Sequence, residues 1–189
     1  MKLLFVDCCI SQRGKESRTL ALAKAYIDAF RAAHPDWEVE RADPMDLPPL
    51  TAEFLDDRDT RKGEFSAPMF AAARQFQSAD SIVVAAPYWD LSYPAQLKTY
   101  IEHISANGLC YHYTEQGCQG DCKAEKLVYL TSGGDFEGED SVGVLHWKQL
   151  CKMFGIETFT YVFAGGLDID PAKTPELLAQ ACEKARSLV

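Results

Sequence analysis

Residues 82–104 read IVVAAPYWDLSYPAQLKTYIEHI, and this one stretch predicts a buried strand, a loop and a helix. The apolar run at residues 82–86 has the length and composition of a strand that is buried on both faces, as in parallel sheets. Pro87 stops the strand, and Pro94 stands at the helix start, where a missing amide hydrogen costs least. The stretch therefore predicts half of a βαβ unit.

The same alternation of strand and helix is expected along the rest of the chain. Further strands are predicted at residues 3–6, 37–40, 127–130 and 156–164, and further helices at residues 17–34, 66–78, 141–154 and 171–188. Residues 43–62 are expected to be rich in loops, and residues 105–125 to be irregular. Strands alternating with helices predict an α/β fold, a flavodoxin-like doubly wound sheet of five parallel strands in the order 2-1-3-4-5. The length of 189 residues favours a single domain over residues 1–189.

Composition narrows the class of protein. The formal net charge of −9 argues against a nucleic-acid-binding protein and against docking on anionic lipid. The apolar run at the N-terminus is too short for a secretory signal, and no stretch approaches the roughly 20 apolar residues of a membrane span. Seven cysteines at irregular spacing favour reduced thiols. A cytoplasmic protein with no membrane or nucleic-acid partner is expected.

The position of a ligand follows from the expected topology. In an open parallel sheet, ligands bind beyond the carboxyl ends of the strands, at the point where the strand order reverses. Here that point lies between the first and third strands. Three loops should meet there, at residues 9–19, 87–94 and 131–138.

The first loop, CISQRGKESRT, has the composition of a phosphate site. It ends at a helix start, where free amide groups and the helix dipole favour an anion. Ser17 and Thr19 can add hydroxyl groups, and Arg13, Lys15 and Arg18 can add positive charge. The alternative is an ordinary helix cap with exposed basic residues. The spacing of a P-loop is absent, as is the G-x-G-x-x-G fingerprint.

The other two loops suit a flat ring. In PYWDLSYP, Tyr88, Trp89 and Leu91 could supply apolar faces, although the aromatic residues could equally pack in the core or at a subunit contact. In TSGGDFEG, Gly133 and Gly134 permit close approach of the backbone to a ligand, although a tight turn would also explain them.

Together these segments resemble the flavodoxin-like FMN-dependent NAD(P)H:quinone reductases and azoreductases. APYWDLSYPAQLKTYIEHI is similar to the stretch P-x-[YW]-N-F-x-x-P-x-Q-L-K of that family, and ESRTLALA resembles its phosphate loop. GLCYHYTEQGCQG resembles its G-x-[TA]-F-x-Y-[TS]-x-x-G segment, and TSGG resembles its [TS]-x-G-G turn. The resemblance extends over essentially the whole chain, with the segments in the same order.

The resemblance implies a cofactor site. FMN is the expected cofactor, with FAD as an alternative and NAD(P)H as co-substrate. The residues implied are Cys9, Ser17, Arg18 and Thr19 at the phosphate, Pro87, Tyr88, Trp89, Asp90 and Leu91 along the isoalloxazine, and Thr131, Ser132, Gly133 and Gly134 at its other edge. The resemblance further implies a homodimer with the active site at the interface, which would place Tyr113 on the substrate side.

Three positions depart from the family pattern. Asp90 stands where the family usually has Asn, Cys8 and Cys9 stand where hydroxyl residues are common, and Ser132 replaces a frequent Arg. An ionised carboxylate cannot donate a hydrogen bond. If Asp90 faces the flavin, its charge should disfavour an anionic reduced ring and lower the reduction potential.

The expected activity is transfer of hydride from NAD(P)H through FMN to a quinone, azo or nitro acceptor in a ping-pong cycle. This scheme requires no acid–base dyad, and His112 and Tyr113 are candidates only for polarising the acceptor. Three alternatives stay open: a flavodoxin-type electron carrier, a flavin-less sensor, and a zinc site. The zinc site would use Cys110, His112, Cys118 and Cys122, whose spacing is uncommon for zinc, so no metal is expected.

Overall fold

The sheet has the predicted topology. The computed structural model describes residues 1–10, 17–136 and 140–189. Five strands pair in parallel in the order β2-β1-β3-β6-β7, which is the order 2-1-3-4-5 for the strands of this sheet, so the prediction is confirmed. They are β1 (Lys2–Asp7), β2 (Glu38–Ala42), β3 (Ser81–Ala85), β6 (Lys126–Ser132) and β7 (Thr158–Ala164). The strand order reverses between β1 and β3.

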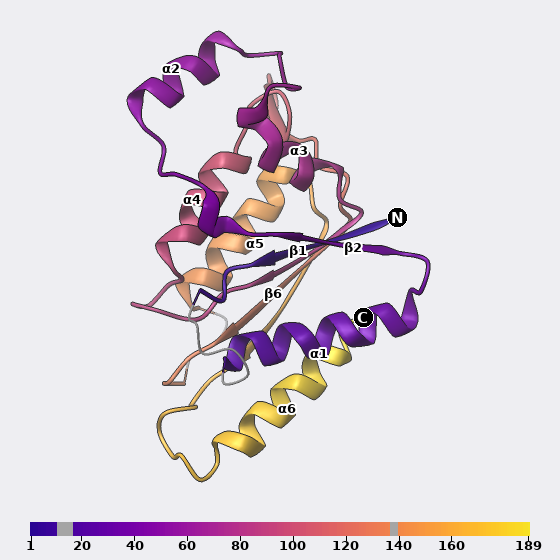
Figure 1. The fold of residues 1–189 in the computed structure, drawn as a ribbon, viewed down its shortest axis with the longest axis vertical. Coiled ribbons are helices and arrows are strands. Elements are labelled where there is room, and N and C mark those ends of the chain that lie inside the picture. The colour runs from indigo at the N-terminus through magenta and orange to yellow at the C-terminus, as the bar shows by residue number, and fades with distance from the viewer. Residues whose placement is uncertain (11–16, 137–139) are drawn as a thin grey trace.

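Helices cover both faces of this sheet (Figure 1). On one face α1 (Arg18–Ala33) and α6 (Thr174–Arg186) lie side by side. On the other face lie α3 (Ala71–Ser78), α4 (Ala95–Ile104) and α5 (Val142–Phe154). Two short 3-10 helices, η2 (Pro44–Asp46) and η3 (Pro68–Phe70), complete the links around them.

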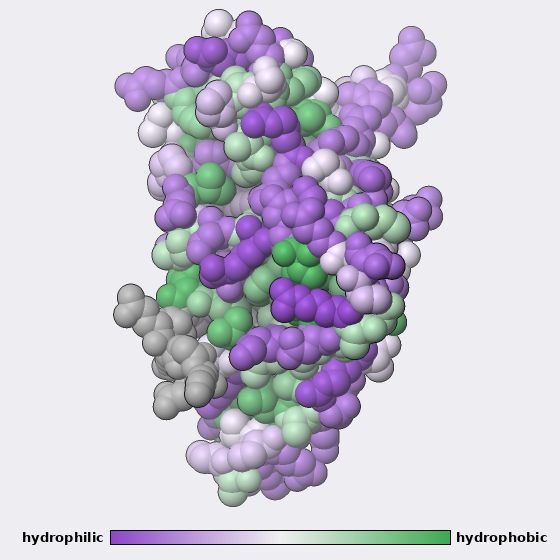
Figure 2. Space-filling view, turned by 45° about the vertical axis from the view of Figure 1, so that its right-hand side comes forward, coloured by the Kyte–Doolittle hydropathy of each residue, from purple (hydrophilic) through white to green (hydrophobic). Residues whose placement is uncertain are grey.

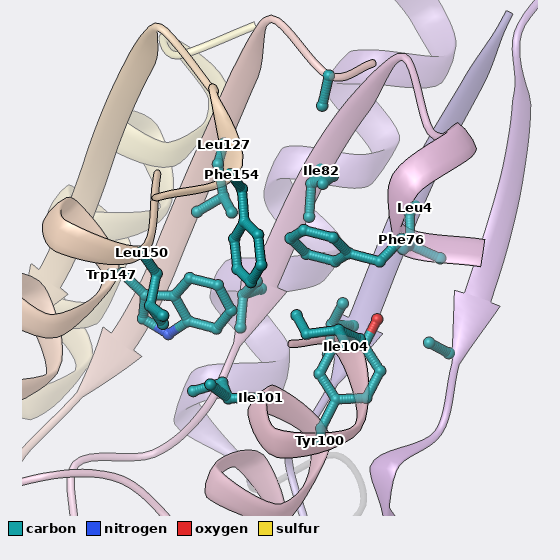
Figure 3. Close-up of a cluster of buried hydrophobic side chains, with 14 of the residues drawn as sticks. Leu4, Phe76, Ile82, Tyr100, Ile101, Ile104, Leu127, Trp147, Leu150 and Phe154 are labelled. Carbon is teal, nitrogen blue, oxygen red and sulfur yellow. The ribbon is translucent and has the colours of Figure 1, made fainter. Parts of the chain in front are cut away.

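The pleat of the strands divides the core between the two faces. Leu4, Ile82 and Leu127 point to the side of α3, α4 and α5, whereas their neighbours Leu3 and Val83 point to the side of α1 and α6. Figure 3 shows the first cluster, in which the side chains from the strands meet large rings from the three helices, among them Phe76, Tyr100, Trp147 and Phe154. Burial on both faces explains why these strands read as continuous apolar runs.

Local signals set the ends of the helices beside the site. The side chain of Ser17 accepts a hydrogen bond from the amide of Leu20 (3.3 Å), so Ser17 caps α1 as its position predicted. Gly155 ends α5 with a positive φ of 78°, a conformation that costs glycine little. Ser17 therefore sets the residue at which α1 begins, and Gly155 sets the residue at which the chain leaves α5 and turns back toward β7.

Two segments differ from the sequence prediction. Residues 43–62, expected to be loop-rich, contain the helix α2 (Ala52–Thr60), which is capped by Thr51 and buries none of its residues. Residues 105–125, expected to be irregular, contain the antiparallel hairpin β4 (Tyr111–Thr114) and β5 (Gly117–Gly120). Neither segment has a buried apolar stripe, which is the signal on which the prediction depended.

The surface agrees with the composition. The face shown in Figure 2 is mainly hydrophilic, with apolar residues in small patches. None of the helices in the described ranges is both long enough and apolar enough to cross a lipid bilayer.

We expect Leu127→Ala to lower the free energy of unfolding by about 2–5 kcal/mol, because truncating a buried leucine leaves a cavity. Leu127 is fully buried between the sheet and Phe154. The matched control is Leu55→Ala on α2, where the leucine is 38% exposed, and the expected loss there is under about 1 kcal/mol. Urea unfolding at a fixed protein concentration measures both, and equal losses would contradict this account of the core.

Candidate functional site

A cleft opens at the carboxyl ends of β1, β3 and β6, and members of all three predicted loops line it. Its volume is about 260 Å³. The lining residues are Cys9, Ser17, Arg18, Thr19, Pro87, Tyr88, Trp89, Ser132, Gly133, Gly134 and Asp168. Ten of these were predicted from the sequence, and only Asp168 was not. Arg13 and Lys15, two cations of the first loop, lie outside the described residues.

One end of the cleft is the first turn of α1. The amide groups of the first turn of a helix have no intrahelical acceptor and carry the positive end of its dipole. Arg18 points its guanidinium at Asp168, with 2.7 Å between Nη1 and Oδ1. Thr19 shares a hydrogen bond with Ser132 (2.6 Å between the hydroxyl oxygens), which ties α1 to the end of β6. This end of the cleft thus combines a helix start, hydroxyl groups and a guanidinium, the kinds of group with which proteins bind anions.

The segment after β6 approaches its neighbours closely. The amide of Gly133 donates to the carbonyl of Ala164 (3.0 Å), and the carbonyl of Gly134 accepts from the amide of Asp168 (3.0 Å). A Cβ at Gly133 would lie 2.9 Å from the ring of Phe163, and one at Gly134 would collide with the carboxylate of Asp168. The close packing of this wall therefore favours glycine at both positions, whether or not a ligand lies against it.

The loop after β3 forms the aromatic wall. The amide of Tyr88 donates to the carbonyl of Ser132 (2.9 Å), and the Tyr88 ring packs edge-on against Phe163 at 5.3 Å between centroids. Trp89 and Ser92 exchange backbone hydrogen bonds of 3.3 and 2.8 Å across a two-residue turn. Trp89 remains 43% exposed beside the cleft. The wall is thus apolar, aromatic and accessible.

The tip of this turn is strained. Asp90 and Leu91 have φ values of 51° and 62°, the left-handed conformation that the two central residues of a type I′ turn require. Such turns usually carry Asn-Gly, because a left-handed residue with a side chain costs roughly 1–2 kcal/mol. Leu91 is in addition 68% exposed. The fold therefore holds an apolar side chain in an unfavourable backbone conformation at the edge of the cleft.

A half-buried pair anchors the other end of the loop. The hydroxyl of Tyr93 and Nδ1 of His146 on α5 form a hydrogen bond, and the two rings stack at 5.9 Å between centroids. Burial raises the pKa of Tyr93 to about 12, and burial also lowers the pKa of His146. Near pH 7 the phenol is therefore protonated and the imidazole neutral, and the hydrogen bond between them holds the loop against α5.

Cys9 contributes a neutral wall to the cleft. Its amide donates to the carboxylate of Asp7 (3.0 Å). Burial, with a further contribution from the charge of Asp7, raises the pKa of the Cys9 thiol far above its usual range. A thiol held in its neutral form is a poor nucleophile, so Cys9 is suited to packing and not to covalent chemistry.

Five predicted residues lie outside the lining of the cleft. Asp90 and Leu91 are exposed at the tip of the turn, and Thr131 is fully buried near the end of β6. His112 and Tyr113 are exposed on the hairpin, where Nδ1 of His112 lies 2.8 Å from the carboxylate of Asp121. In this chain alone, neither hairpin residue faces the cleft.

The zinc alternative has no assembled ligand set. Across residues 1–10, 17–136 and 140–189, no group of three or more His, Cys, Asp or Glu side chains is arranged to hold a metal ion. Cys118 is exposed on the hairpin, whereas Cys110 is buried beneath it.

The sequence prediction missed Asp168. This residue follows β7 in the segment GGLDID, and it also stands beyond the carboxyl end of a parallel strand. The rule that placed the other three loops therefore applied to this one too, but no aromatic residue or hydroxyl cluster marked it.

Comparison with known proteins agrees with this architecture. Residues 1–189 match a family model described as the flavodoxin-like fold. The chain belongs to that family. The FMN-dependent NADH:quinone oxidoreductase of Clostridium beijerinckii is 32% identical over 191 residues, which cover 98% of this chain and 96% of that protein. The resemblance inferred from the sequence motifs is confirmed.

Solved structures show the same fold. An azoreductase from Bacillus anthracis superimposes with a TM-score of 0.87 at 24% identity, covering 100% of this chain and 98% of that one. An FMN-dependent NADH-azoreductase from the same species, in complex with FMN, superimposes with a TM-score of 0.78 at 18% identity, covering 99% and 98%.

We expect Leu91→Gly to raise the free energy of unfolding by up to about 1 kcal/mol, because glycine adopts the left-handed conformation without the steric cost. Leu91→Ala keeps the Cβ and should give no such gain, so it is the matched control. Urea unfolding of the three proteins measures the difference. A Leu91→Gly variant no more stable than Leu91→Ala would show that the positive φ of Leu91 stores no strain.

Proposed function

We propose that this protein is an FMN-dependent oxidoreductase that takes hydride from NADH or NADPH and reduces a quinone, azo or nitro compound. The observation that carries the proposal is the cleft itself, which combines a cationic helix start at one end with an accessible aromatic wall at the other. The curated and solved relatives support it, since their names are those of quinone oxidoreductases and azoreductases that depend on FMN.

The donor set at the first end fits the phosphate of FMN. Arg18 supplies a guanidinium, Ser17 and Thr19 supply hydroxyl groups, and the first turn of α1 supplies free amides. In a chain of net charge −9 this local cation and dipole are what would attract an anion. We propose that these residues hold the phosphate, with Cys9 packing beside them.

The second end fits a planar ring. Pro87, Tyr88 and Trp89 offer apolar surface, and Ser132, Gly133 and Gly134 present backbone at the opposite side of the cleft. We propose that Leu91 and the amides of Asp90 and Leu91 border the ring from the exposed turn, and that Thr131 supports this edge from below. Bound there, FMN supplies the two-electron chemistry that links a nicotinamide to the acceptor. The protein's residues orient the ring and leave one face open.

A single cleft also explains the proposed order of events. The described residues form one aromatic cleft at the strand crossover, so the nicotinamide and the acceptor must use it in turn. We therefore propose a ping-pong cycle. His112 and Tyr113 would act on the acceptor only if a second copy brings a hairpin to the cleft.

A homodimer is proposed on the surface beside the cleft. Large apolar side chains stay exposed on the loops and helix around the carboxyl edge of the sheet, namely Trp89, Leu91, Phe136, Val142 and Leu145. Exposed apolar groups that gather in one region mark interaction sites. We further propose a cytoplasmic location, because all seven cysteines are free thiols, as a reducing compartment would keep them.

The deciding experiment is anaerobic reduction of the purified protein reconstituted with FMN. We expect a flavin absorption spectrum that NADH or NADPH bleaches and that a quinone then restores. A flavodoxin-type carrier would bind FMN but would not be reduced rapidly by nicotinamide, and absence of FMN binding would reject the enzyme.

A matched pair of variants tests the phosphate end. We expect Arg18→Gln to weaken FMN binding by about tenfold, the scale of one charge-assisted hydrogen bond, while riboflavin binding changes little. Lys24→Gln removes the same charge two turns further along α1, away from the cleft, and should leave both affinities unchanged. Titration of flavin fluorescence measures them. If Arg18→Gln weakened riboflavin binding as much as FMN binding, Arg18 would not act on the phosphate, and this prediction would be contradicted.

A further inference from the structure

We propose that Asp168 is a specificity-determining residue of the cleft, which limits the contribution of a flavin's phosphate to binding. This inference rests on the proposed function, because it concerns how that same cleft treats FMN. Asp168 stands at the phosphate end, on the loop between β7 and α6, opposite the first turn of α1.

The backbone fixes the place of Asp168. Its amide donates to the carbonyl of Gly134 (3.0 Å), and the preceding amide of Leu167 donates to the carbonyl of Gly133 (3.3 Å). A Cβ on Gly134 would collide with the Asp168 carboxylate, so the carboxylate packs directly on the turn after β6. Asp168 is therefore a built part of the wall, although its side chain is 65% exposed.

The charges at this end of the cleft come from one ion pair. Among the described residues that line the cleft, Arg18 is the one cation and Asp168 the one carboxylate, and they lie 2.7 Å apart. The carboxylate thus uses the guanidinium that a phosphate would need. A phosphate monoester carries about −1.5 to −2 charges at pH 7, and it would meet the negative charge of Asp168 as it reached Arg18.

The charge of Asp168 should affect flavins with a phosphate and flavins without one differently. A ligand without a phosphate gains nothing from Arg18 and is not repelled by Asp168, whereas FMN gains from the first and is opposed by the second. Asp168 should therefore reduce the preference of the cleft for FMN over riboflavin. An ordinary residue of the wall would affect both flavins equally, since both carry the same ring.

The test compares the dissociation constants of FMN and riboflavin, by fluorescence quenching at an ionic strength of about 0.1 M, for the wild type, Asp168→Asn and Asp170→Asn. Asparagine keeps the shape of Asp168 and removes its charge. We expect Asp168→Asn to bind FMN about tenfold more tightly, which is about 1.4 kcal/mol, and riboflavin within about twofold of the wild type.

Asp170→Asn is the matched control. Asp170 lies on the same loop and carries the same charge, but its carboxylate accepts from the amide of Ala172 (3.0 Å) and does not line the cleft. Its substitution should leave both affinities within about twofold, since a charge away from the cleft is screened by solvent. An equal effect of Asp170→Asn on FMN would reduce the observation to net charge and would overturn the proposal.

Further outcomes of the same experiment would overturn the proposal. Unchanged or weaker FMN binding by Asp168→Asn, or equal tightening of both flavins, would overturn the role assigned to Asp168. If no protein binds either flavin, the proposed function fails, and inorganic phosphate then tests Asp168 by itself. Phosphate should raise the thermal midpoint of Asp168→Asn more than that of the wild type, and equal shifts would overturn the proposal.

Discussion

The parallel pairing of β1, β3 and β6 is the constraint on which the rest of the structure depends. Parallel strands place all their carboxyl ends at one edge, and the reversal of strand order between β1 and β3 sends the helices that follow these strands to opposite faces, which opens a crevice at that edge. The pairing is in turn enforced by burial, because neighbouring residues of each strand enter opposite cores and a shift by one residue would exchange them. The cleft is thus positioned by two apolar clusters whose buried residues do not line it.

The loops at the carboxyl edge of the sheet are linked to one another by hydrogen bonds, and Ser132 takes part in two of them. Its hydroxyl bonds to Thr19 at the start of α1, and its carbonyl accepts from Tyr88 in the aromatic loop. The two glycines that follow pair with the loop after β7. Four segments that are distant in sequence are therefore linked through three consecutive residues. In an enzyme of the proposed kind, such mutual support would keep the walls of the cleft in place without help from the ligand.

The sequence predicted the parts of this structure that periodicity and topology determine. The strands buried on two faces were recognisable from residues such as Ile82 and Leu127, and the rule for parallel sheets then located most of the cleft from Cys9 to Gly134. The helix α2 was missed because it buries nothing, and the hairpin because its short strands are mainly exposed. Asp168 could not be placed as a partner of Arg18, since 150 positions separate them and it is the pairing of the loop after β7 with the turn after β6 that brings Asp168 to the start of α1.

The places where local rules are broken lie together around the cleft. A leucine occupies a left-handed position where glycine is favoured, large apolar side chains remain exposed, and a carboxylate stands beside the first turn of α1, where we propose that a phosphate binds. Each of these features costs stability or affinity when considered singly, and none is needed to form the sheet or either core. A glycine at Leu91 or a polar residue at Trp89 would satisfy the backbone equally well. Their concentration at the carboxyl edge of the sheet is the pattern that the proposed binding site would produce there.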